Sequence, residues 1–362
     1  MTGEEPSPAG ADHSFWRRVE EQVAGLNPGY FAMVMATGIL STATRDLGLP
    51  WISLPLLYVA AASYVVLCVL TGWRVLKFPH RVLTDATGPE RAFAFFTFVA
   101  GSDVLGLRLA AAGDLALGEA LAVLAAAAWL LLTYAVPAAL IAAPNKVPFA
   151  SSVNGTWLIW VVGTQSLASA AATFALSHRA QAEELVFVAV ALWGFGAILY
   201  LLLMAIILPR LVLGEVSADQ LAPPYWITMG ATAITVLAAA RILAVPVRLP
   251  IPAPTLSGLT FAFWAFGTWW IPLLLLLGVW RHVLKRVRLV YEPTLWGMVF
   301  PLGMYAASSD SFGRITGLGV LESVARVEVW FGLVAWVATF AGLLASLWAT
   351  LRLSGAGTRS GT

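Results

Sequence analysis

Ten stretches of this chain are long and apolar enough to cross a lipid bilayer as helices, and this feature limits the fold more than any other. A hydrocarbon core of about 30 Å requires about 20 apolar residues per helix. A membrane β-barrel would need alternating strands of about ten residues, which the continuous Ala, Leu and Val runs exclude. The ten expected spans are residues 28–45, 52–75, 89–109, 115–140, 152–175, 184–207, 223–243, 256–282, 293–312 and 326–352.

The composition agrees with an all-α integral membrane protein. Hydrophobic residues make up 60% of the chain and charged residues only 11%, whereas soluble domains carry about 25% charged residues. Soluble enzymes, nucleic-acid-binding proteins and disordered proteins are therefore excluded. The single cysteine, Cys68, cannot form an intramolecular disulfide. The four histidines are scattered and match no metal-binding motif, so we expect neither a metal nor a cofactor.

The odd-numbered spans begin alike, with Pro or Asn followed a few residues later by an aromatic residue. Their starts at positions 28, 89, 154, 223 and 293 are separated by 61, 65, 69 and 70 residues. So steady a period indicates five copies of one helical hairpin. Because each copy contains two spans, all copies run in the same direction and are related by an axis along the membrane normal.

The two spans of each hairpin differ in character. The odd spans are rich in Gly, Ser and Thr, whereas the even spans are mainly Ala, Leu, Val and Trp. Since polar groups in a membrane face protein or water, we expect five odd helices inside and five even helices outside, around a central pore. The alternative is that the small residues only allow close helix packing. The residues predicted to line the pore are Thr37, Gly38, Gly101, Gly163, Thr164, Thr228, Gly230 and Gly303.

The distribution of Lys and Arg predicts the orientation and the domain limits. With ten spans both termini lie on one side, which carries 14 of the 21 basic residues, so we expect cytoplasmic termini in the plasma or inner membrane. Residues 1–26 are a polar segment, in which Phe15, Val19 and Val23 predict a short interfacial helix. The transmembrane domain covers residues 27–352, and residues 353–362 form a tail expected to be disordered.

Several motifs resemble the tellurite-resistance/dicarboxylate transporter family, which includes bacterial TehA and the plant slow-type anion channels. The longest are NPGYFAMVMATG from Asn27 to Gly38 and LWGMVFPLGMY from Leu295 to Tyr305. PYWITMG from Pro224 to Gly230 is another, and the resemblance covers roughly residues 26–350. It implies ten helices in five hairpins around a central pore, and a homotrimer with one pore in each subunit.

The resemblance also implies a gate. In channel members of the family a phenylalanine before a proline of the ninth helix plugs the pore, and Phe300 before Pro301 occupies that place here. Independently, Pro301 cannot donate a backbone hydrogen bond and should kink its helix at mid-membrane. Such a kink can turn an aromatic ring across the axis. The alternative is that Phe300 packs between helices.

Charged residues suggest a mouth and a proton site. Arg45, Arg108, Arg241 and Arg314 lie near the non-cytoplasmic ends of odd spans, where a ring of arginines would concentrate anions. They could instead pair with neighbouring aspartates. Asp103 is the exceptional carboxylate inside a span and is a possible proton site.

These observations predict transport of small anions, such as chloride, nitrate, four-carbon dicarboxylates like malate, or tellurite-type oxyanions. Two mechanisms remain open: a channel gated by Phe300, or a symporter in which Asp103 carries the proton. An intramembrane enzyme is less favoured, because we find no paired catalytic groups at membrane depth.

Overall fold

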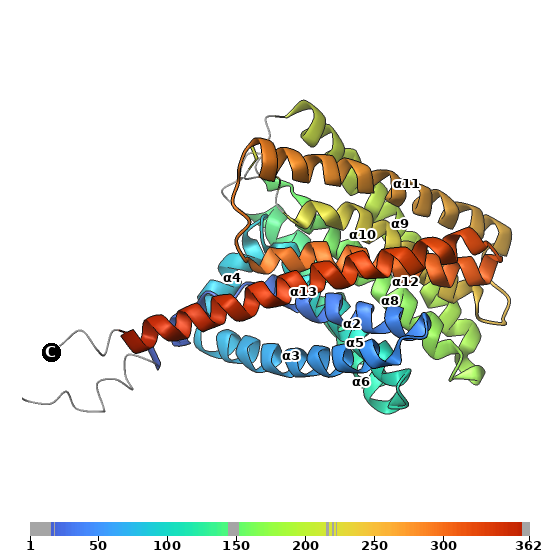
Figure 1. Cartoon of the computed structure of the whole chain (residues 1–362). Helices are drawn as coiled ribbons and strands as arrows, with labels where there is room; N and C mark the ends of the chain where they lie inside the picture. Colours follow the sequence, from blue (N-terminus) through green and yellow to red (C-terminus); the bar gives the residue numbers. More distant parts are fainter. Residues whose placement is uncertain are drawn as a thin grey trace, which may run out of the picture.

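The structure is a computed structural model that describes residues 16–17, 19–143, 152–214, 217–218, 221 and 223–356. In this part of the chain every regular element is a helix (Figure 1). Eight of the helices are long and apolar enough to cross a membrane. The predicted all-helical membrane protein is thereby confirmed.

Five helices form an inner set, and a short 3-10 turn leads directly into each one. The pairs of turn and helix are η1 Pro28–Phe31 with α2 Ala32–Asp46, η2 Ala92–Phe95 with α5 Phe96–Ala110, η3 Gly155–Leu158 with α8 Ile159–Ala175, η5 Pro223–Trp226 with α10 Ile227–Leu243, and η7 Pro293–Leu295 with α12 Trp296–Thr316. These turns coincide with the repeated motifs at which we expected the odd spans to begin.

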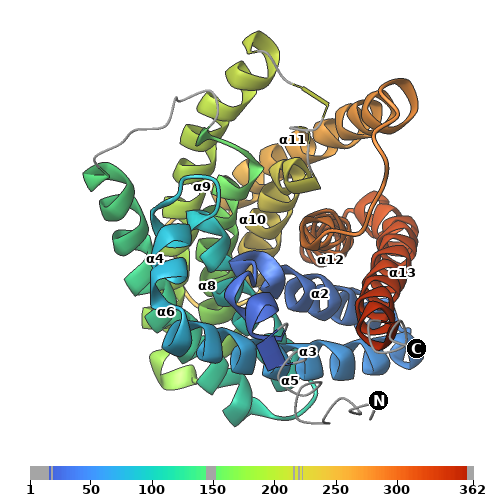
Figure 2. The same ribbon diagram turned by 90° about the vertical axis from the view of Figure 1, so that its left-hand side faces the viewer.

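The inner helices form a closed ring, which we call the ring (Figure 2). Each inner helix contacts the next one along the chain, from α2 through α5, α8 and α10 to α12, and α12 contacts α2. The 3-10 turns contact one another in the same cyclic order. The other five helices form a shell, and each lies against two neighbouring ring helices. The shell consists of α3 Pro50–Lys77, α6 Leu115–Ala142, α9 Ala182–Leu213, α11 Ala253–Val279 and α13 Gly319–Ala356.

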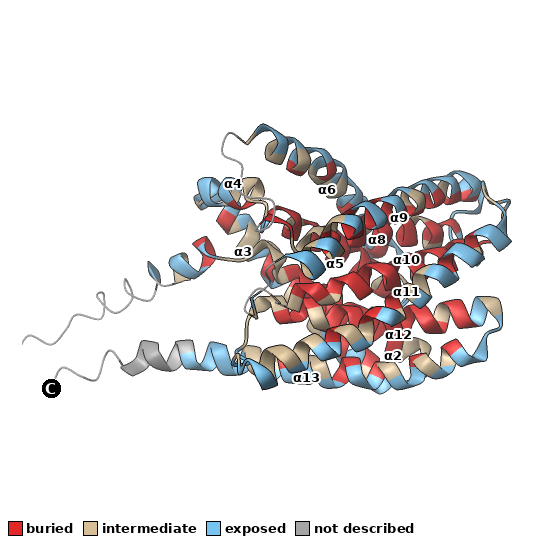
Figure 3. Ribbon diagram, turned by 90° about the horizontal axis from the view of Figure 1, so that it is seen from above, coloured by how far each residue is buried: buried red, intermediate tan, exposed pale blue. Residues whose placement is uncertain are grey.

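Burial separates the ring from the shell (Figure 3). In the most apolar 18 residues of α5, α8 and α10, each taken with its 3-10 turn, 83% of residues are buried, against 17–44% in the shell helices. The exposed shell residues are large and apolar, for example Val123, Leu202 and Val334. Such a surface requires a lipid environment, because water would not solvate it.

One end of the ring is the face at which all five ring helices begin; we call it the terminal face. The helical segment 19–24 lies there, since Arg74 near the end of α3 donates a hydrogen bond of 3.2 Å to the carbonyl oxygen of Ala24. Arg74 also pairs with Asp85 at 2.6 Å, which fixes the short helix α4, Pro79–Thr87, to α3. The opposite end is called the far face.

The terminal segments are described only in part. Val19 and Val23 lie in the helical segment, but Phe15, the third residue of the predicted interfacial helix, lies outside the described residues. At the other end α13 runs to Ala356, so the helix extends four residues into the tail that we expected to begin at 353. The rest of that tail, residues 357–362, lies outside the described residues.

Candidate functional site

A cavity of about 490 Å³ opens on the terminal face inside the ring; we call it the vestibule. All five ring helices contribute to its wall, through Met35, Thr97, Val162, Ile227 and Phe300. Along η1 and α2 the wall runs from Asn27 to Met35, which is about 12 Å along a helix axis. The vestibule therefore reaches well into the ring.

The vestibule ends at Phe300, whose side chain is only 2% exposed. The neighbouring Pro301 lies against Gly230 of α10, where a Cβ atom would come within 2.7 Å of the proline ring. The helix α12 continues through Pro301 from Trp296 to Thr316. The glycine on α10 thus gives the proline room, and the phenylalanine projects from a helix fixed at this point.

A second, very small cavity of about 10 Å³ lies beyond Phe300. Each ring helix again contributes to the wall, through Ile39, Val104, Ser166, Ile234 and Met304. Met304 follows Phe300 by one helical turn. No residue lines both this cavity and the vestibule, so packed side chains close the axis between them.

The third cavity along the axis, of about 200 Å³, opens towards the far face and is lined by Arg45, Asp46 and Arg241. Arg241 also lines the small inner cavity, so this residue lies where the two cavities meet. Its Nη1 donates a hydrogen bond of 2.8 Å to the hydroxyl of Ser169. Among the described residues no carboxylate lies within ion-pair distance of Arg241. A cation without a counter-ion therefore faces the axis here.

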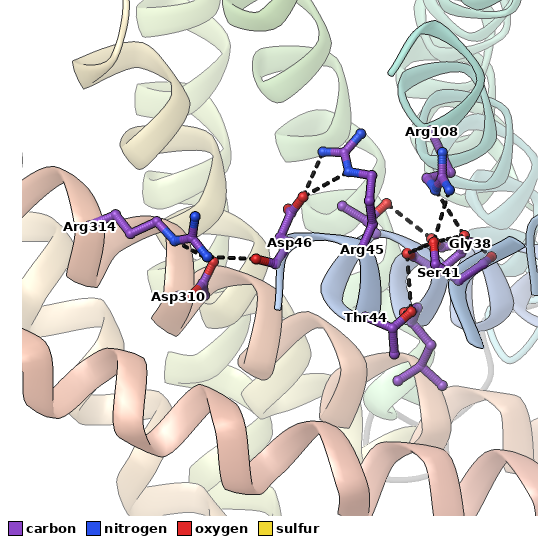
Figure 4. Close-up of polar contacts among 11 residues, drawn as sticks. Gly38, Ser41, Thr44, Arg45, Asp46, Arg108, Asp310 and Arg314 are labelled. Atoms are coloured by element: carbon purple, nitrogen blue, oxygen red, sulfur yellow. Dashed lines mark hydrogen bonds and ion pairs between the residues drawn. The ribbon is translucent and has the colours of Figure 1, made fainter. Parts of the chain in front are cut away.

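Two of the other predicted mouth arginines, Arg108 and Arg314, line none of the three axial cavities and have local partners (Figure 4). Arg108 is buried and donates to the hydroxyls of Ser41 and Ser53 at 2.9 and 2.8 Å, which ties α5 to α2 and α3. Arg314 pairs with Asp310 at 2.9 Å on its own helix. The alternative of pairing with an aspartate therefore describes Arg314 but not Arg108, which bonds two serine hydroxyls because a buried guanidinium needs acceptors close by.

Arg45 fits both expectations for these arginines, a position at the far-face mouth and pairing with an aspartate. It lines the far-face cavity, and its Nη2 also lies 2.6 Å from the carboxylate of Asp46. Asp46 itself accepts a hydrogen bond from Arg314 at its backbone carbonyl, as Figure 4 shows. The far-face mouth therefore holds Arg241 without a carboxylate partner and Arg45 with one.

Asp103 lies between α5 and α8 and is fully buried. One carboxyl oxygen lies 2.6 Å from the hydroxyl of Ser166, and the other has no hydrogen-bond partner among the described residues. Asp103 lines none of the three axial cavities, but Ser166 lines the small one. The carboxyl group is therefore one side chain away from the axis.

The glycines that we expected to line the pore lie instead at the contacts between ring helices. There a Cβ atom would come within 2.7–3.4 Å of the neighbouring helix, and glycine permits such close packing of membrane helices. The five contacts are Gly38 with Val104, Gly101 with Phe31, Gly163 with Phe96, Gly230 with Pro301, and Gly303 with Leu40.

The threonines expected in the pore are also placed elsewhere. The hydroxyls of Thr37 and Thr164 accept hydrogen bonds of 2.9 Å from the indole N–H groups of Trp336 and Trp129 in the shell. The hydroxyl of Thr228 donates to the carbonyl of Tyr225 one turn earlier. A buried hydroxyl is satisfied by the nearest partner, which here lies outside the ring or on the same helix. None of the eight residues lines an axial cavity.

Two further cations line the rim of the vestibule, and our sequence analysis did not assign them to the site. Arg91 contacts Asp85 at 3.2 Å, and Arg210, near the end of α9, donates to the hydroxyl of Tyr225. Glu90 and Glu292 line the same rim. The useful clue was position, because Arg91 directly precedes the second 3-10 turn. In the described part of the chain no three metal-ligating side chains come together.

Comparison with known proteins gives a consistent result. The model of a family described as voltage-dependent anion channels matches residues 25–344, which is most of the chain. Two uncharacterized transporters of Methanocaldococcus jannaschii are each 25% identical to it. The alignments span 329 and 320 residues, covering 89% and 86% of this chain and 94% and 90% of the relatives.

A shorter relative is more similar. An uncharacterized membrane protein of Mycobacterium tuberculosis is 42% identical over 160 residues, which is 43% of this chain and 81% of that protein.

Proposed function

The chain belongs to the voltage-dependent anion channel family, and on this premise we propose that it carries small anions along the axis of its ring. The family consists of membrane transporters and channels, and two relatives are named as transporters. The proposal assigns the transport path to the vestibule, the small cavity and the far-face cavity, in that order.

We propose that all ten long helices span the membrane. Eight meet the requirements of length and hydropathy. The remaining two, α2 and α12, lie in the ring beside α5 and α10, with their 3-10 turns on the same face. With its turn, α2 has 19 residues, and α12 has 21 without one, which at 1.5 Å per residue gives about 30 Å. Shielded by the shell, they can be more polar than helices that contact lipid.

The observation that carries the proposal is the end of the vestibule at Phe300. A cavity with walls from five parallel helices stops at one aromatic side chain, and a smaller cavity continues on the same axis beyond it. An apolar constriction of this kind stops ions by steric block or by excluding water. We propose that Phe300, held in position by Pro301, is the gate.

The electrostatic field along this path favours anions. All five ring helices start at the terminal face, and each helix start carries roughly half a positive elementary charge from its backbone dipoles. At the rim of the vestibule Glu90 and Glu292 offset the charges of Arg91 and Arg210, and Arg241 adds positive charge beyond the gate. Hydroxyls and a single guanidinium bind an anion weakly enough to release it. Chloride, nitrate, malate-like dicarboxylates and tellurite-type oxyanions are the proposed substrates.

Orientation and assembly complete the proposal. The excess of Lys and Arg on the terminal side supports a cytoplasmic position for this face and both termini, in a plasma or inner membrane. Resemblance to the family supports a homotrimer in which each subunit keeps its own pore. The vestibule then faces the cytoplasm, and the Arg241 cavity faces the opposite side.

One observation favours a second function, proton-coupled dicarboxylate symport. The Ser166 hydroxyl has one hydrogen but lies 2.6 Å from Asp103 and 2.9 Å from the carbonyl of Gly163. Both contacts are satisfied if a protonated Asp103 donates to Ser166 and Ser166 donates to Gly163. A carboxyl group that holds a proton beside the path is what a symporter requires.

The test of the gate is Phe300→Ala, measured as anion efflux from proteoliposomes. Removing the ring should raise chloride and nitrate efflux at least tenfold. The matched control is Phe312→Ala, since Phe312 is equally buried on α12 but packs against Leu321 and Val236, away from the axial cavities. Unchanged efflux from a correctly folded Phe300→Ala protein, or an equal increase in the control, contradicts the proposal.

The same proteoliposomes separate the channel from the symporter. A channel conducts malate at a rate set by the voltage and the malate gradient, whereas a symporter also accumulates malate when only a proton gradient is applied. Accumulation driven by pH would establish the second function.

A further inference from the structure

A groove of about 340 Å³ lies outside the ring on the terminal face, between the end of α11 and the start of α12. Much of its wall is apolar, including Leu274, Leu277 and Met298. Two arginines, Arg281 and Arg288, and one acidic residue, Glu292, also line it. An apolar trough with cations in its wall suits an amphipathic ligand that carries negative charge at one end.

The arginines belong to a turn of defined geometry. After α11 the chain forms a π-helical turn, Trp280–Leu284, closed by a hydrogen bond of 2.9 Å from the Lys285 amide to the Trp280 carbonyl. Arg286 then adopts a left-handed backbone conformation with φ of 55°, unusual for a residue other than glycine. The Val287 amide returns to the carbonyl of Arg281 at 3.1 Å. The turn holds its cations in place before any ligand binds.

The turn has no acidic partner of its own. Five basic side chains lie within eight residues, and no Asp or Glu occurs between Val279 and Tyr291. No ion pair forms at any of the five within the described part of the chain. The buried Nε of Arg281 also has no hydrogen-bond partner there. The five basic residues are Arg281, His282, Lys285, Arg286 and Arg288.

The position of the turn matches the headgroup layer of a bilayer. The apolar helix that begins at Ala253 continues to Leu284 and has 32 residues, which is about 48 Å and exceeds a hydrocarbon core of about 30 Å. Its last turns therefore extend into the headgroup region. Leu275 and Val279, on the last turns before the basic residues, are more than half exposed and face the space that acyl chains would fill.

We propose that this groove is a binding site for one anionic phospholipid of the leaflet at the terminal face. The phosphate would lie among Arg281, Arg288 and the other cations of the turn, and an acyl chain would follow Leu275 and Val279 along α11. Basic pockets between membrane helices bind acidic headgroups in this way. A zwitterionic phospholipid has no net charge and gains less from the same cations.

The groove also contacts the path that we propose for anions, and this second step rests on the proposed function. Tyr225 and Glu292 line both the groove and the vestibule. Leu295 and Met298 line the groove and precede Phe300 on the chain by five and two residues. A bound lipid therefore supports the segment from which the gate projects, so transport should depend on the acidic lipid content of the membrane.

Binding is tested by native mass spectrometry of the purified full-length protein with phosphatidylglycerol or phosphatidylcholine. We expect phosphatidylglycerol to bind at least tenfold more tightly, and the Arg281→Gln/Arg288→Gln variant to lose that preference. The matched control is Arg179→Gln/Arg248→Gln, which removes two exposed arginines at the far face. Equal affinity for the two lipids, or an unchanged preference in the Arg281→Gln/Arg288→Gln variant, overturns the proposal.

A second variant keeps all the charges. Gly278 lines the groove, and a Cβ atom there would meet nothing within 4 Å, so Gly278→Leu should fill the groove without disturbing the fold. Gly258→Leu is the control, because Gly258 lies on the same helix, away from the groove, and also has free space. We expect Gly278→Leu to reduce phosphatidylglycerol binding at least tenfold and Gly258→Leu to leave it unchanged. Unchanged binding in Gly278→Leu overturns the site.

Flux measurements distinguish failure of the site from failure of the proposed function. Wild-type anion efflux should change at least twofold between phosphatidylcholine vesicles and vesicles with added phosphatidylglycerol, and Gly278→Leu efflux should not. If wild-type efflux is the same with and without phosphatidylglycerol, the proposed coupling between the lipid groove and the gate is overturned. Absence of efflux from every vesicle, with lipid binding intact, contradicts the transport function and leaves the binding site standing.

Discussion

The ring is built from helices of 15–21 residues and the shell from helices of 27–38 residues, and the two layers pack by different rules. Ring helices approach one another through glycines, whose missing side chains let backbones come close, as Gly38, Gly101 and Gly163 do. In the shell, glycines that face the ring are equally crowded, since a Cβ atom at Gly118 or Gly332 would come within 2.9 Å of a ring helix. By contrast, Gly194, Gly258 and Gly278 have nothing within 4 Å of a Cβ position. The same residue type is thus a packing requirement where a helix faces the ring and replaceable where the shell leaves open space.

Polar side chains differ between the layers in a related way. Shell tryptophans reach inward to hydroxyl groups of the ring: Trp129 donates to Thr164, Trp264 to Ser309 and Trp336 to Thr37, each at 2.9 Å. Three hydroxyls of the ring are thereby satisfied from outside, while Phe300 and Met304 contribute apolar side chains to the axial cavities. This comparison teaches that small polar residues of the inner helices serve assembly before they serve conduction.

The strongest test of the difference between the layers is a pair of glycine substitutions. A Cβ atom at Gly155 would overlap the backbone of Pro224, whereas Gly194 in α9 has open space. We expect Gly155→Ala to destabilise the protein by about 3 kcal/mol, since a rigid backbone cannot move aside. Gly194→Ala should be neutral or slightly stabilising, because alanine favours helix formation. Thermal unfolding in detergent measures both, and equal Tm values would contradict the comparison.

The next test compares two arginines near the far face. Arg241 lines the axis, whereas Arg248 is exposed beyond the end of α10. Loss of one charged hydrogen-bonding group costs about 1.4 kcal/mol, so Arg241→Gln should lower the apparent affinity for nitrate roughly tenfold. Arg248→Gln should change it less than twofold. Concentration dependence of nitrate flux provides the measurement, and the same affinity in both variants would remove Arg241 from the path.

A smaller effect is expected where the two layers are joined. Trp129→Phe keeps the aromatic ring but removes the donor to Thr164, at a cost of about 1 kcal/mol. Trp330→Phe is a fair control, since Trp330 is half exposed in the shell. We expect a lower Tm for Trp129→Phe alone. No difference between the variants would show that the indole bond contributes no stability.

The smallest effect is predicted at Asp103. If this buried residue carries a proton, Asp103→Asn replaces one neutral group with another of similar shape, and stability should change by less than about 0.5 kcal/mol. Under the channel mechanism, efflux is also unchanged at two pH values. Under the symport mechanism, accumulation of malate driven by pH disappears. A large fall in Tm would show that the carboxylate is charged.

Sequence alone predicted the helices better than the site. The repeated starts at 28, 154 and 223 match the 3-10 turns, because Pro, Asn and aromatic residues mark helix starts through local chemistry. The short helix α4 was missed, because its nine residues follow the end of a span and carry no long apolar run. Local composition does not register such an element.

Composition could not assign the walls of the cavities. A ring helix is buried on every side, so no periodic change in polarity separates the axis from the contacts with neighbouring helices. Met35 and Met304, which line cavities, look like ordinary core residues, whereas Gly303 and Thr37 look like pore residues and lie elsewhere. Only the relative rotation of the helices decides this, and that rotation depends on contacts between distant segments.

The way each shell helix lies across the joint between two ring helices has a mechanical consequence. To widen as a whole, the ring would have to separate several contacts between neighbouring ring helices at once. A shell helix packs against both helices at each of these contacts. Rotation of one aromatic side chain about its own bonds leaves all of these helix contacts intact. Under the gate that we propose, the ring can therefore stay rigid while the Phe300 side chain alone opens and closes the path.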